Sequence, residues 1–64
     1  MIKVTRLDHS ELVVNAELIE TVEATPDTVI TLTSGKKLVV SEDVDEIIHR
    51  VMEYRRHAYG AQQK

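Results

Sequence analysis

The residues that could do chemistry in this chain are its histidines and carboxylates, because the sequence contains no cysteine. His49 and His57 lie eight residues apart in a stretch with helical periodicity. This is about two helical turns, too far for both imidazoles to bind one metal ion. A catalytic carboxylate pair needs burial or a close neighbour to separate its two pKa values, and the surroundings of the four carboxylates between residues 17 and 27 indicate neither. These carboxylates are Glu17, Glu20, Glu23 and Asp27.

We therefore expect no enzyme, no catalytic, cofactor-binding or metal site, and no small-molecule substrate. The 64 residues allow one domain. A chain of this length buries only about 60% of its unfolded surface, so a single copy is marginally stable. Small folds usually add disulfides, a metal or self-association. The chain has no cysteine for a disulfide, and its three histidines are too scattered for a metal site, so we predict a homo-oligomer. We expect residues 1–58 to form the domain and residues 59–64 to form a frayed tail.

Charge and hydropathy exclude several classes of protein. The net charge of −3 argues against a protein that coats nucleic acid. No apolar run approaches the ~20 residues that a transmembrane segment needs. The first residues, MIKVTRLDH, lack the continuous apolar core of a signal peptide. We expect a cytoplasmic protein. If it works at a membrane, a partner protein must hold it there.

Alternating apolar and polar residues rich in β-branched side chains predict short strands over residues 2–7, 11–15, 19–24, 28–32 and 36–40. We predict that three-residue loops, each ending in a left-handed residue, connect the hairpins. These loops are Asp8-His9-Ser10, Thr25-Pro26-Asp27 and Thr33-Ser34-Gly35. Asn15 is expected to cap a single helical turn at the corner between two strands.

The expected register places Arg6 opposite Leu12, Val22 opposite Ile30, and Ile30 opposite Leu38. This register gathers the aliphatic residues on one face, whereas two-residue loops would mix Lys37 and Glu23 into that face. The predicted core face is Ile2, Val4, Leu12, Val14, Val22, Ala24, Ile30, Leu32, Leu38 and Val40.

A helix is expected to begin after Ser41 as N-cap and to end near Gly60 as C-cap. Its apolar stripe is Val44, Ile47, Ile48, Val51 and Tyr54 or Arg55. The fold class is thus α+β: a small curved antiparallel sheet of four to five short strands, followed by one C-terminal amphipathic helix. Acidic residues begin the helix and basic residues end it, which complements the helix dipole. Arg50, Arg55 and Arg56 alternatively form a basic patch for an acidic partner or lipid headgroups.

One helix can cover only one face of a small sheet, so aliphatic residues of the other face stay uncovered. These are Leu7, Val13, Val29 and Val39, with Val29 opposite Val39 in the expected register. We predict that these four residues form an interface for self-assembly or for a protein partner.

The stretch NAELIETVEATPDTVITLTSGKKLVVSEDVDEII closely resembles the flagellar FlbD family, also called swarming motility protein SwrD. The segments MIKVTRL and VMEYRR fit as well, so the resemblance covers nearly the whole chain. Two places depart from the pattern: Asp8-His9-Ser10 lacks the expected Asn-Gly, and Leu38 stands where an aromatic residue is common. The resemblance implies a small bacterial cytoplasmic protein that is needed for efficient flagellar or swarming motility. It also implies support of motor power through the stator units, a place at the motor, and no enzymatic residues.

The alternative is a small RNA-binding regulatory protein. Lys3, Arg6, Lys36 and Lys37 would then form a basic strip along the strands. The acidic net charge argues against it, as does the shortage of aromatic side chains for base stacking, since the chain has only two tyrosines and no other aromatic residue. Nucleic acid is therefore not the expected partner.

Overall fold

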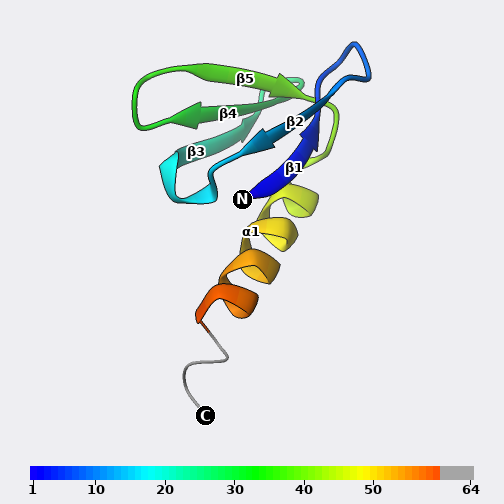
Figure 1. Cartoon of the computed structure of the whole chain (residues 1–64). Helices are drawn as coiled ribbons and strands as arrows, with labels where there is room; N and C mark the ends of the chain where they lie inside the picture. The colour runs from blue at the N-terminus through cyan, green and yellow to red at the C-terminus, as the bar shows by residue number, and fades with distance from the viewer. Residues whose placement is uncertain (60–64) are drawn as a thin grey trace.

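The computed structural model describes residues 1–59. The chain forms five strands, one short 3₁₀ turn and one helix (Figure 1), which confirms the α+β class. In order these are β1 (Ile2–Thr5), β2 (Glu11–Val14), η1 (Ala16–Leu18), β3 (Ile19–Ala24), β4 (Thr28–Leu32), β5 (Lys37–Val40) and α1 (Val44–Tyr59). The expected C-cap at Gly60 and residues 61–64 of the expected tail lie outside the described residues, whereas Tyr59 is the last residue of α1.

The strands form two antiparallel sheets, β1–β2 and β3–β4–β5, where the sequence predicted one curved sheet. The two sheets meet where the end of β1 runs past the end of β5. A single antiparallel bridge joins Arg6 to Val40, and the Ser41 backbone N–H donates to the Thr5 carbonyl at 2.8 Å. The contact stays this short because the chain enters the β1–β2 turn directly after Arg6. The two sheets can therefore turn their inner faces toward one another.

From Thr21 onward, the registers of the three-stranded sheet agree with the prediction. An irregularity between Ile19 and Thr21 shifts the pairing at the start of β3 by one residue, so that Ile19 lies opposite Leu32. Val22 lies opposite Ile30, and Ile30 lies opposite Leu38. The β4–β5 loop has the predicted three residues, with Gly35 at a φ of 91° and its N–H donating to the Leu32 carbonyl at 2.8 Å. Glycine takes this left-handed conformation without the steric cost that a Cβ imposes.

The first hairpin differs from the prediction, because its turn lies one residue earlier. Val4 rather than Arg6 is opposite Leu12. The left-handed residue is His9, with a φ of 74°, instead of Ser10. The Asp8 carboxylate explains the position of the turn, since Oδ1 accepts hydrogen bonds from the Ser10 N–H at 3.0 Å and from the Ser10 hydroxyl at 2.6 Å. Moving a turn by one residue shifts each pairing by two, so the inward face of each strand is unchanged.

The β3–β4 turn also differs from the expected conformation. Asp27 was expected to be left-handed, yet within residues 1–59 only His9 and Gly35 have a positive φ. The Thr25–Pro26 peptide bond is cis, and the Thr25 N–H donates to the Asp27 carbonyl at 2.9 Å. Ala24, next to this turn, is exposed rather than part of the core.

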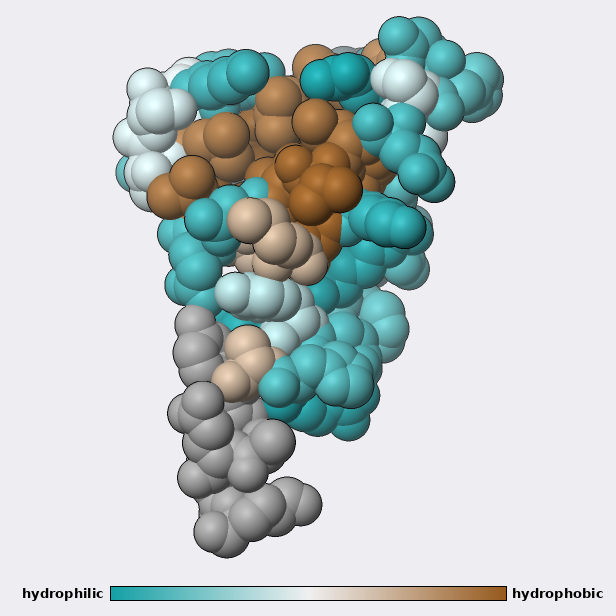
Figure 2. Space-filling model, viewed as in Figure 1, coloured by the Kyte–Doolittle hydropathy of each residue, from teal (hydrophilic) through white to brown (hydrophobic). Residues whose placement is uncertain are grey.

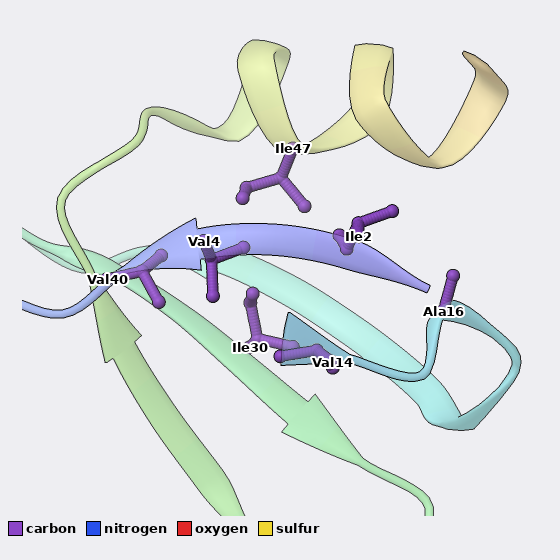
Figure 3. Packing of buried hydrophobic residues seen from close by; sticks show 7 residues of the cluster. All are labelled: Ile2, Val4, Val14, Ala16, Ile30, Val40 and Ile47. Carbon is purple, nitrogen blue, oxygen red and sulfur yellow. The ribbon is translucent and has the colours of Figure 1, made fainter. Parts of the chain in front are cut away.

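The core lies between the two sheets and the helix (Figure 3). Its buried aliphatic residues are Ile2, Val4, Val14, Ala16, Ile30, Val40 and Ile47. Ile30 from β4 and Ile47 from α1 are completely buried. Side chains from both sheets and from the helix therefore pack together in one small hydrophobic cluster. The predicted residues Leu12, Val22, Leu32 and Leu38 pack against its edge and are only partly buried.

The helix N-cap is Asp43, where Ser41 was expected. Asp43 Oδ1 accepts a hydrogen bond from the Glu46 backbone N–H at 2.8 Å, which satisfies a free donor of the first turn. Ser41 instead belongs to the connection with β1, where its backbone N–H and its hydroxyl both donate to the Thr5 carbonyl. The corner prediction is confirmed, since the Asn15 side chain accepts from the Glu17 N–H at the start of η1. The helix contacts β1 and β3 and then extends beyond the strands (Figure 1).

Candidate interaction surfaces

Arg50 is the most heavily bonded side chain of the predicted basic patch. Its Nη1 donates to Glu42 Oε2 at 3.0 Å and to the Lys3 carbonyl at 2.7 Å, while its Nε donates to Glu46 Oε2 at 2.8 Å. Glu42 Oε1 in turn accepts from the Thr5 backbone N–H at 2.9 Å. This network joins α1 to β1, so Arg50 is engaged within the fold rather than offered to a partner.

The electrostatics of the pair match this geometry. Burial of the Glu42 carboxyl acts to raise its pKa, but the hydrogen bonds from Thr5 and the charge of Arg50 outweigh that effect and lower the pKa below its ordinary value. The hydrogen bond to Glu46 is the main cause that raises the pKa of Arg50, with the charge of Glu42 adding to it. Glu42 is therefore an ionised carboxylate of which only 9% of the side chain is exposed.

Arg55 and Arg56 point to other sides of the helix. A helix turns by about 100° per residue, so Arg55 lies about 140° around the axis from Arg50. Arg56 donates to Glu53, which also lies 3.6 Å from His57 Nε2 through its other oxygen. Arg55 is exposed, and no described residue forms an ion pair or hydrogen bond with it. Within residues 1–59 the three arginines therefore do not form one patch, and only Arg55 has an unengaged charge.

The four residues of the predicted interface lie on more than one surface. Val29 and Val39 are cross-strand neighbours on the outer face of the three-stranded sheet, where Val39 is 42% exposed. Val13 is on the outer face of the other sheet, opposite Lys3, and Leu7 is in the β1–β2 loop. Because the inner faces of the sheets share one core, their outer faces point away from one another. The structure brings Val29 together with Val39, and their role in an interface stays a prediction.

An apolar groove between α1 and β3 was missed by the sequence reasoning. It has a volume of about 210 Å³ and is lined by Ala16, Ile19, Val22, Ile47, Ile48, Val51, Met52 and Arg55. Ile48 is 50% exposed and Met52 is 61% exposed, although Ile48 was expected in the covered stripe. The available signal was the four-residue spacing of Ile48 and Met52, which places both on one side of a helix next to the buried Ile47.

A second, more polar cleft of about 530 Å³ lies between the β1–β2 hairpin and α1. His49, Glu53 and His57 line it from the helix, and Lys3 and Glu11 line it from the strands. Both histidines thus border one cleft, although residues 1–59 contain no group of three or more side chains that could hold a metal ion.

The four basic residues of the nucleic-acid alternative are also separated. Arg6 and Lys36 meet at a hollow of about 160 Å³ between the sheets, beside Leu12 and Leu38. Lys3 lines the polar cleft instead. Lys37 pairs with Thr31 on the outer face of the larger sheet. Figure 2 shows hydrophobic side chains gathered over the strands on one face and a largely hydrophilic helix below them.

These features define a small α+β domain that presents apolar surface and shallow hollows, with no described constellation of catalytic groups. The chain matches the FlbD family, described as flagellar and swarming motility proteins, over residues 1–59, and it belongs to that family. No curated protein and no solved structure matched it. Across residues 1–59, no helix has the length and apolar character needed to cross a membrane.

Proposed function

We propose that this protein supports flagellar and swarming motility by protein–protein contacts that promote the power of the flagellar motor through its stator units, and that it catalyses no reaction. Membership of the FlbD family supports the link to motility. The Val29–Val39 pair on the outer face of the sheet, with Val39 exposed and Val29 half-buried, is the observation that supports contact as its mode of action. The proposed location of the protein is the cytoplasmic side of the flagellar motor.

The outer face of the β3–β4–β5 sheet suits a contact with a protein. Glu23, Val29 and Val39 form one cross-strand row. Thr31 and Lys37 lie in the next row. An apolar centre with charged and hydroxyl neighbours is the usual composition of a contact patch, where apolar area contributes affinity and the polar rim contributes specificity.

The test is a double substitution, Val29→Thr with Val39→Thr, followed by measurement of swarm expansion and of motor torque in tethered cells. Threonine keeps the β-branched shape and the strand preference, so the sheet should persist while the patch becomes polar. Torque should fall at unchanged protein abundance. The matched control is Val13→Thr, the same change at a 57% exposed position on the other sheet, which should leave motility unchanged.

Normal torque in the double variant would remove the assignment of this surface. Normal torque in a strain that lacks the protein altogether would remove the proposed effect on motor power. Recovery of stator proteins with the wild-type chain, and their loss with the double variant, would identify the partner.

A further inference from the structure

One face of α1 carries an acidic residue, two exposed apolar residues and a basic residue in succession. These are Asp45, Ile48, Met52 and Arg55, at spacings of three, four and three residues. Such spacings keep side chains on one side of a helix. Ile48 and Met52 are the most exposed large apolar side chains of the helix, and Met52 and Arg55 also border the apolar groove against β3.

The two charged ends of this face are unengaged within the copy. Glu42 and Glu46 bond to Arg50, Glu53 bonds to Arg56, and Asp43 caps the helix. Asp45 and Arg55 are exposed, and no ion pair or hydrogen bond joins either side chain to another described residue. The helix therefore pairs most of its other charges and leaves free one acid and one base, on either side of the apolar pair.

We propose that this face binds the same face of a second copy, with the two α1 helices antiparallel about a twofold axis. The axis crosses the helices at the level of residue 50, on the side away from the Arg50 side chain. A pairing centred there places Ile48 opposite Met52 of the second copy and Asp45 opposite Arg55 of the second copy. A twofold axis repeats each contact, so the interface has two apolar pairs and two ion pairs. The order acid, apolar, apolar, base is self-complementary only in the antiparallel direction.

The groove between α1 and β3 supports the same arrangement. Its walls include Ile19, Val22 and Val51, which give apolar surface beside the paired helices. Side chains of the second copy that enter the groove would cover part of this surface. Added apolar burial is what a chain of 64 residues lacks as a monomer. The charge order selects a second copy over an unrelated apolar helix, because such a helix would leave Asp45 and Arg55 unpaired.

A charge-swap experiment on the full chain tests the pairing. Asp45→Arg and Arg55→Asp each place like charges opposite one another twice per dimer, and each should raise the dimer dissociation constant about tenfold. The combined variant restores opposite charges and should return the constant to near the wild-type value. The Asp45→Arg change also opposes the helix dipole in the first turn, so a restored dimer cannot result from a more stable helix.

The controls are Asp27→Arg and Arg6→Asp, which make the same kinds of charge change at exposed positions outside the helix and should leave the dissociation constant within about twofold. Sedimentation equilibrium and native mass measurement provide the constant. The chain has no cysteine, so a second assay can mix Ile48→Cys chains with Met52→Cys chains under mild oxidation. A disulfide should form between the two kinds of chain faster than within either kind alone.

Three results would overturn the proposal. The first is a wild-type chain that sediments as a monomer at millimolar concentration. The second is a dimer that both single reversals leave intact or that the swap fails to restore. The third is binding of a different protein to this face by a monomeric chain. Normal dimerisation of the Val29→Thr and Val39→Thr double variant would show that the dimer and the proposed motor contact use separate surfaces.

Discussion

The carboxylate of Glu42 lies 3.0 Å from the guanidinium of Arg50 and connects the segment before the helix to the helix itself. The same carboxylate holds the Thr5 backbone N–H, and the same guanidinium holds the Lys3 carbonyl. The pair thus fastens α1, the last element of the fold, to β1, the first. In a domain with so small a core, this polar clasp positions the helix over the sheets.

Glu42→Gln should lower the free energy of unfolding by about 1–3 kcal/mol, since a largely buried, charge-assisted pair loses its charge. Urea denaturation measures the change. The matched control is Glu53→Gln, which weakens a solvent-exposed pair with Arg56 and should lower the free energy of unfolding by less than Glu42→Gln does, because water screens the exposed pair. Equal effects of the two variants would contradict the role assigned to Glu42.

The pH dependence of stability should carry the signature of Glu42. Its pKa is lowered in the folded protein, so its contribution is present above the ordinary glutamate value of about 4.3 and is lost as the pH falls through the folded value. The free energy of unfolding should therefore decrease on acidification below about pH 5. Glu42→Gln should reduce this slope without abolishing it, because the pKa values of Asp8 and Glu53 are also lowered. An unchanged slope would show that Glu42 is not coupled to folding.

The two left-handed turn residues predict opposite effects of substitution. Gly35→Ala should destabilise the protein by about 1 kcal/mol, because alanine disfavours a positive φ. Beyond the adjacent residues, a Cβ at Gly35 would have no atom within 4 Å, so contact with the rest of the fold adds nothing to this local cost. His9→Gly, at the equivalent place of the first hairpin, should be neutral or stabilising by up to about 1 kcal/mol. Thermal unfolding measures both, and a destabilised His9→Gly variant would indicate that the imidazole has a role of its own.

Neighbouring isoleucines of the helix should behave differently. Ile47→Ala should cost about 2–5 kcal/mol, because Ile47 is completely buried in the core. Ile48→Ala should cost much less in a dilute monomer, since half of its side chain is exposed. Unfolding measured over a range of protein concentrations separates this local cost from any effect on association. Similar costs at low concentration would contradict the observed packing of α1.

The RNA-binding alternative makes a prediction that can be checked directly. Its basic residues lie on separate surfaces, so the chain should pass through heparin without retention and give no salt-sensitive RNA shift at micromolar protein. Arg6 and Lys36, which share one hollow, are the residues to neutralise if a shift is seen. A shift that the Arg6→Gln and Lys36→Gln double variant removes would establish the alternative.

Much of the fold follows from the period of two in the strands. Val4, Val14, Ile30 and Val40 were all assigned to the inward face, and all are buried. This assignment survives the displaced first turn, because a shift of one residue in the turn changes the partners without changing the face. The class of fold and the family likewise follow from local pattern, since each depends on residues close together in the sequence.

The tertiary structure alone decided which faces meet and which charges are engaged. Periodicity places Val13 and Val29 outward but does not reveal that two sheets direct them apart. Composition places Arg50 and Arg55 in one basic segment, yet only the packing of α1 on β1 commits Arg50 to Glu42 and leaves Arg55 exposed. The physical reason is distance along the chain: the bond from Arg50 to the Lys3 carbonyl spans 47 residues. No local pattern encodes a contact of that separation, because it exists only once the core has brought the two ends of the chain together.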